Sequence, residues 1–148
     1  VLKFHLSSAL KLKPTEVALA RLAKMHEPTY LHQTMGRAKD GSIVRFKDIP
    51  FAMAAIDQLR TLEELRVHFH VPVNADRLSD ELSTTNDHLK AALDVIAKAP
   101  GACRELEIET YTWEVLPPEV RAADVADMIA EEYRWTLAEL AQRGVQPL

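Results

Sequence analysis

Two short segments of this chain place ionisable side chains at every second position of an otherwise apolar run. His68 and His70 belong to one run, and Glu107 and Glu109 belong to the other. Because alternate residues of a β-strand share a face, each pair is expected to project to one side of its strand. Histidines and carboxylates that converge from neighbouring strands can bind a divalent metal or act as an acid/base pair. The alternative is structural, with hydrogen-bonded histidines and with glutamates in salt bridges or in solvent.

Two further histidines are candidates for the same site. His5 lies in the first predicted strand, and it could complete a site with His68 and Glu109 if the three strands are neighbours. His32 lies in a long irregular connection, a kind of segment that often forms a lid or a binding loop, so it could contact a substrate. The alternatives are a hydrogen-bonded core histidine for His5 and an ordinary surface loop for His32.

The composition excludes several classes of function. The 148 residues, 47% of them hydrophobic, fit one soluble globular domain. A net charge of −4 with no dense Lys/Arg cluster argues against a nucleic-acid partner. Cys103 is the single cysteine, which suits a reducing, cytoplasmic location, and no apolar run reaches the length of a membrane span. With 4 glycines and no phosphate-binding loop, a nucleotide is also disfavoured.

The elements that must position these residues alternate along the chain. Strands are expected over residues 2–10, 64–73 and 104–113, and helices over 14–26, 51–59, 87–99 and 122–142. An Asp40-Gly41 turn predicts a small hairpin between residues 31–34 and 43–46. Strand–helix alternation implies an α/β fold with parallel strands and helical crossovers.

Charged residues interrupt the predicted strands on one face only, which is typical of the inner face of a (β/α) barrel. Three βα units cannot close a barrel. We therefore expect a partial TIM barrel, completed by missing strands or by self-association. On this interpretation Glu109, near the C-terminal end of its strand, is a better site candidate than the deeper Glu107. Tyr111 and Trp113 continue the same face, where they would either wall a pocket or pack as core.

Three stretches of the sequence resemble the C-terminal part of the EboE-type metabolite traffic proteins, which belong to the xylose-isomerase-like TIM-barrel superfamily. They are Phe4–Leu10, Val67–Pro72 and Leu106–Pro117, and the segment around His32 fits the same resemblance. The resemblance covers nearly the whole chain, residues 1–148, as a single domain portion containing the last three βα units. Its most specific parts are the His-x-His-Val-Pro and Glu-Thr-Tyr-Thr-Trp strings.

The resemblance implies a divalent metal, zinc or manganese. Glu109 and His68 match ligand positions of the superfamily, and His5 stands where an aspartate is usual; a further glutamate ligand has no counterpart in this sequence. The implied function is isomerisation or epimerisation of a small, polar, sugar-like metabolite. In that reaction His70 would contact the substrate or orient a ligand, and His32 would act from the lid.

Two other functions are compatible with these residues. The same pocket could bind or hand over a metabolite without converting it, as the association of EboE-type proteins with metabolite transport implies. Nuclease or lyase action on damaged DNA is a weaker alternative, because endonuclease IV shares the barrel. The acidic charge balance argues against that last possibility.

Overall fold

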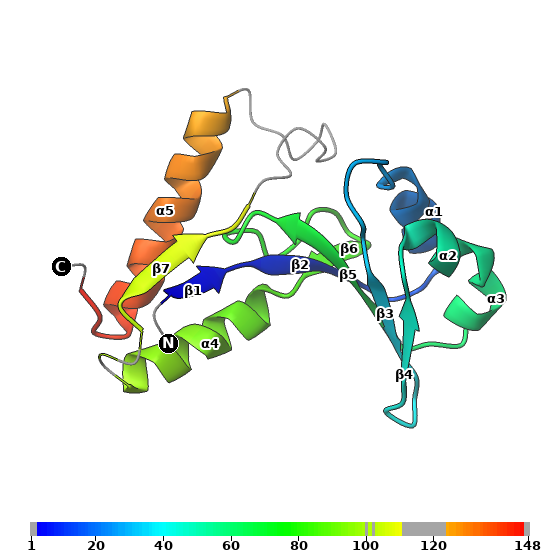
Figure 1. Ribbon diagram of the computed structural model, residues 1–148, viewed down its shortest axis with the longest axis horizontal. Coiled ribbons are helices and arrows are strands. Elements are labelled where there is room, and N and C mark those ends of the chain that lie inside the picture. The colour runs from blue at the N-terminus through cyan, green and yellow to red at the C-terminus, as the bar shows by residue number, and fades with distance from the viewer. Residues whose placement is uncertain (1–2, 100, 102, 111–123, 147–148) are drawn as a thin grey trace.

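The computed structural model describes residues 3–99, 101, 103–110 and 124–146, and within them the chain forms two β-sheets with helices packed against them (Figure 1). The strands are β1 (Lys3–Leu6), β2 (Ser8–Leu12), β3 (Thr34–Arg37), β4 (Ile43–Phe46), β5 (Glu64–Val71), β6 (Leu82–Thr84) and β7 (Glu105–Ile108). The helices are α1 (Glu16–Lys24), α2 (Ile49–Ala54), α3 (Ile56–Leu59), α4 (Asn86–Lys98) and α5 (Val125–Gln142).

The larger sheet is antiparallel and has the strand order β4-β3-β5-β2-β6. Its central strand, β5, carries a run of alternating apolar residues, Leu65, Val67, Phe69 and Val71, that are fully buried. Helices α1 and α2 supply the other side of this core, and both begin where the chain offers a capping side chain. The Thr15 hydroxyl accepts a hydrogen bond from the Ala18 amide at 3.2 Å, and Asp48 caps α2.

The smaller sheet pairs β1 with β7 in parallel, with His5 opposite Glu107. Helices α4 and α5 pack against it around a second apolar cluster that includes Leu6, Leu93 and Leu140. Figure 1 shows β1 leading directly into β2, so one nearly continuous extended segment serves both sheets. This segment brings the end of β5 close to the end of β7.

The expected fold class, a partial TIM barrel built from parallel βα units, is wrong. Only β1 and β7 are parallel among the described strands, and β5 runs antiparallel to both of its neighbours. The predicted strand over residues 2–10 divides at Ser7, and its two halves pair with different partners. The expectation of missing barrel strands depended on that fold class and is dropped with it, and self-association stays a prediction.

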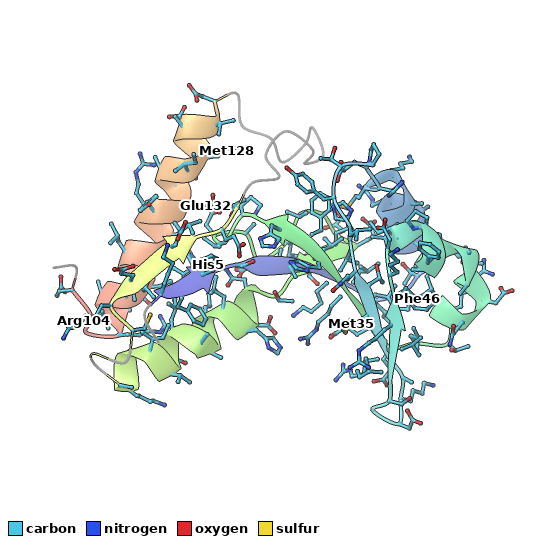
Figure 2. The ribbon with its side chains drawn as sticks, viewed as in Figure 1. His5, Met35, Phe46, Arg104, Met128 and Glu132 are labelled. Atoms are coloured by element: carbon cyan, nitrogen blue, oxygen red, sulfur yellow. The ribbon has the colours of Figure 1, made fainter. Side chains whose placement is uncertain are left out.

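One-sided coverage of the larger sheet explains why apolar and charged residues alternate in β2 and β5, which is part of the pattern that suggested a barrel interior. Helices cover one face of the larger sheet, and the other face carries a row of mostly polar side chains across all five strands. That row is Arg45, Met35, Arg66, Lys11 and Ser83. Figure 2 shows Met35 and Phe46 pointing to opposite sides of the hairpin. Alternation of apolar and charged residues is the ordinary pattern of an antiparallel sheet with one solvated face.

Several local predictions are confirmed with shifted boundaries. The hairpin turns at Asp40-Gly41, although its first strand is β3 rather than residues 31–34. The helices predicted over 14–26, 87–99 and 122–142 correspond to α1, α4 and α5, and the helix predicted over 51–59 divides into α2 and α3. The short strand β6 was not predicted. Gly36 has a packing role, because a Cβ atom there would collide with the Leu62 side chain.

Candidate functional site

Four polar groups meet where β5 passes the end of β7 and the junction of β1 with β2. The Nε2 atoms of His68 and His70 are 2.8 Å apart, and the two rings stack with their centroids 4.9 Å apart. On its other side, Nδ1 of His70 lies 2.6 Å from the Glu109 carbonyl oxygen and 3.1 Å from the Ser7 hydroxyl oxygen. The contact between His70 and Glu109 therefore joins the two sheets.

A break in strand pairing positions the two histidines. Ala9 on β2 pairs with His70, but the next residue, Leu10, pairs with Val67, so the register shifts at this point. His68 and Phe69 on β5 therefore have no paired residue on β2. Irregularities of this kind bend a strand and redirect its side chains, and they are common next to active sites. Here the irregularity accompanies stacked imidazoles, with His70 buried and His68 exposed.

The hydrogen bonds determine which ring nitrogen carries each proton. A carbonyl oxygen can only accept, so the short contact with Glu109 requires a proton on Nδ1 of His70. If the His70 ring carries only that proton, its lone pair lies on Nε2, and the Nε2 of His68 is then the donor. The arrangement excludes Ser7 as a nucleophile activated by His70, because the facing nitrogen is a donor rather than a base.

The environment of His68 adjusts its basicity. Desolvation by its neighbours and the facing His70 ring hold the pKa of His68 below its ordinary value, while the Glu109 carboxylate acts in the opposite direction. A neutral imidazole whose Nε2 donates to His70 has its remaining lone pair on Nδ1. The exposed ring of His68 can therefore accept a proton from a bound molecule.

His5 lies on β1 of the parallel sheet (Figure 2), close to the Glu109 side chain. Its ring nitrogens are 3.5 Å from a carboxylate oxygen of Glu109 and 3.6 Å from one of Glu107. Lys3 donates to Glu107 at 2.6 Å, and this hydrogen bond lowers the pKa of the Glu107 carboxyl. These side chains are about half exposed, so their ion pairs add little to stability. They do form a polar surface that can hydrogen-bond hydroxyl groups.

The expected metal ligands His5, His68 and Glu109 lie in this region, and their assignment as metal ligands stays a prediction. Among the residues that the structure describes, they are not a trio with one ligand atom each within 4.8 Å of one another. The histidine pair is also too close for shared zinc coordination, since two nitrogens on a tetrahedral zinc lie about 3.3 Å apart. The geometry fits a hydrogen bond between His68 and His70.

His32 lies on the core side of β5 rather than over the histidine pair. Its exposed fraction is 1%, and its ring stacks on Phe69 with the centroids 4.8 Å apart. This burial lowers the pKa of His32, and the carboxylates of Glu27 and Asp48 oppose the shift. Tyr111 and Trp113, the predicted pocket walls, lie outside the described residues.

Acidification below about pH 6.5 is expected to destabilise the protein through His32. The unfolded chain takes up a proton near the ordinary histidine pKa, whereas folded His32 resists it, so the free energy of unfolding falls as the pH decreases. One histidine contributes at most about 1.4 kcal/mol per pH unit. Urea unfolding from pH 7.5 to 5.5, with EDTA present, should give a shallower dependence for His32→Gln than for the wild-type chain. An equally steep pH dependence in His32→Gln would contradict the attribution of this effect to His32.

Two components of the site had no recognisable signal in the sequence. The partner of His70 on the β7 side is the backbone carbonyl of Glu109, and no residue type predicts a backbone contact of this kind. The side chain of Ser7 is placed by the bend between β1 and β2, which also was not predicted. The spacing of His68 and His70 predicted that both side chains lie on the same face of one strand. These two residues form the centre of the site.

No protein-family model, curated protein or solved structure matches this chain. The resemblance to EboE-type proteins therefore stays a prediction. Within the described part of the chain, none of the helices combines the length and the apolar character needed to cross a membrane.

Proposed function

We propose that the cluster around His68 and His70 is a proton-transfer centre that isomerises or epimerises a small, polar, sugar-like metabolite. The observation that carries the proposal is the 2.8 Å contact between the two Nε2 atoms, with the outer nitrogen of His70 bonded to a backbone carbonyl. General acid–base catalysis needs a positioned group whose pKa lies near the working pH. An imidazole held in one tautomer by a second imidazole meets that need.

His68 is the proposed catalytic base. Its Nδ1 removes a proton from the carbon next to the carbonyl group of the substrate and thereby becomes an imidazolium. The positive charge is stabilised by the nearby Glu109 carboxylate, whose interaction with His68 favours the protonated ring. The imidazolium exchanges this proton with solvent and then delivers a proton to the former carbonyl carbon, while the hydroxyl proton of the adjacent carbon passes to the former carbonyl oxygen, which gives isomerisation. Delivery of a solvent proton to the opposite face of the original carbon gives epimerisation. His70 is a positioning residue that acts through His68.

Polar side chains next to the histidine pair support a sugar-like substrate. His5, Glu107 and Lys3 lie side by side on the parallel sheet, and each is partly open to solvent. Carboxylates accept hydrogen bonds from hydroxyl groups, and a lysine ammonium group donates to hydroxyl or phosphate oxygens. A molecule with several hydroxyl groups would therefore find partners beside the proposed base.

Deuterium incorporation tests this function. The protein would be incubated in D₂O with a panel of aldoses, ketoses and their phosphates, and proton NMR would follow exchange of the hydrogen next to the carbonyl group. We expect exchange with at least one sugar and a loss of about a hundredfold or more in His68→Gln. His88→Gln, which changes an exposed histidine on α4, is the matched control and should retain the wild-type rate. Absence of exchange across the panel would refute the catalytic proposal.

Metabolite binding without conversion is the second candidate. It is favoured by the arrangement of His5, His68 and Glu109, which offers hydrogen-bonding groups but, among the described residues, is not a preformed metal trio. Saturation-transfer NMR on the same panel distinguishes the two candidates. Binding that is lost in His68→Gln, with no deuterium incorporation by the wild-type chain, would favour a binding protein.

A further inference from the structure

A second cluster of ionisable side chains lies on the other side of β5. His26, His32 and Asp48 each bring one ligand atom into a group whose members are all within 4.8 Å of one another. His26 follows α1, His32 lies in the connection to β3, and Asp48 caps α2. Three segments that are separate in the sequence therefore meet at this point, and none of these residues belongs to the proposed proton-transfer centre.

The buried His32 ring lies between two carboxylates without a hydrogen bond from either ring nitrogen to them. Its Nε2 is 3.8 Å from Oε1 of Glu27, and its Nδ1 is 4.0 Å from Oδ1 of Asp48. Nδ1 has no hydrogen-bond partner among the described residues even though it is fully buried. An unpartnered polar atom at this depth is costly unless a further group satisfies it.

Both carboxylates are held in place by backbone amides. Glu27 accepts from the amides of Thr29 and Tyr30 at 2.7 Å each, and Oδ1 of Asp48 accepts from the amides of Ile49 and His32. Hydrogen bonds of this kind favour the ionised form of a carboxyl group. Neither carboxylate is therefore free to rotate towards the His32 ring without losing these bonds.

The protonation state of His32 creates an electrostatic conflict. Burial favours the neutral ring, and a neutral imidazole carries a single N–H. If that proton faces Glu27, the lone pair of Nδ1 faces the carboxylate of Asp48. A cation between Nδ1 and Asp48 would remove the repulsion and satisfy the buried nitrogen, and His26 lies where it can supply a third ligand.

We propose that His26, His32 and Asp48 bind one divalent transition-metal ion of the zinc class. Two imidazoles and a carboxylate are an ordinary donor set for zinc and leave at least one coordination position for water. The ligand atoms must move closer together than 4.8 Å, because zinc ligands lie about 3.3 Å apart. Exposed His26 can make most of that movement. The ion would tie the connection after α1 to the start of α2.

Zinc titration of the full chain tests the site. After removal of metal with EDTA and exchange into chelator-free buffer, calorimetry should show one equivalent of Zn²⁺ bound, and Co²⁺ should give a visible absorption spectrum typical of nitrogen and oxygen ligands. His26→Gln and Asp48→Asn should each weaken binding at least about tenfold, since loss of an outer-shell partner already costs about 10- to 100-fold. An asparagine side chain can also cap a helix, so Asp48→Asn preserves the start of α2.

Two control variants separate this site from the proton-transfer centre. His88→Gln and His68→Gln should bind Zn²⁺ with wild-type affinity, although His68→Gln should slow deuterium incorporation by about a hundredfold or more. Absence of stoichiometric binding, or equal affinity in H26Q, D48N and the wild-type chain, would overturn the metal proposal. It would also be overturned if H68Q alone lost the ion. A ¹⁵N NMR spectrum showing His32 protonated on both nitrogens at pH 7.5 in the presence of Zn²⁺ would equally refute it.

Discussion

Replacement of Phe69 by alanine is expected to lower the free energy of unfolding by about 3 to 5 kcal/mol. Phe69 lies on the central strand β5 with an exposed fraction of 1%, and it is among the largest fully buried side chains of the described residues. Its removal would leave a cavity under α1 and α2 and would take away the ring on which His32 stacks. Urea unfolding followed by circular dichroism measures the loss.

Phe51 provides a matched control for this substitution. It lies on α2 and its exposed fraction is 58%, so Phe51→Ala removes the same atoms from a largely solvated position. Surface substitutions of this kind usually change stability by no more than about 0.5 kcal/mol. Similar losses for Phe69→Ala and Phe51→Ala would contradict the placement of Phe69 at the centre of the larger core.

Replacement of Glu132 by alanine is expected to produce the second large loss of stability. Glu132 lies on α5 with an exposed fraction of 1%, and its Oε1 accepts from the Val73 amide at 2.9 Å and from the Thr110 hydroxyl at 2.6 Å. Figure 2 shows this side chain between α5 and β7. Each buried donor that loses its acceptor costs about 1 to 3 kcal/mol, so the combined loss should reach several kcal/mol.

The neighbouring Glu131 separates this effect from a general change of charge on α5. Glu131 is exposed and lies 3.9 Å from Arg134 in a surface pair, which contributes little to stability. Urea unfolding should therefore show a large loss for Glu132→Ala and almost none for Glu131→Ala. Because Thr110 follows Glu109, Glu132→Ala should also shift the NMR signals of His70. Equal stability of the two variants would contradict the role of Glu132 in holding α5.

Helix positions could be predicted from sequence because their signals are local. Thr15 and Asp48 cap α1 and α2 through hydrogen bonds to amides no more than three residues away. Apolar spacing in the later segments likewise indicated α4 and α5. The boundary at Ala55, where α2 ends and α3 begins, was not predicted, since apolar spacing continues across it.

The composition of the proposed site was predictable only in part. Alternation placed His68 and His70 on one face of a strand, and it identified the polar face of the segment containing Glu109. The metal interpretation of His5, His68 and Glu109 depended on strand order and exact spacing. Such spatial arrangements have no local signal in the sequence. His26 and Asp48, for example, meet His32 in space, although Asp48 is 16 residues away from His32 along the chain.

By itself, the sequence determined where most helices and the main strands form, which strand residues are apolar, and which histidines and glutamates alternate with them. These properties depend on caps, turns and periodicity within a few residues. The tertiary structure alone decided that β5 pairs antiparallel with β2, that the first extended segment bends at Ser7 to serve two sheets, and that His32 is buried between two carboxylates. Pairing direction depends on contacts between distant segments, and an alternating strand fits the solvated face of an antiparallel sheet as well as the interior of a barrel.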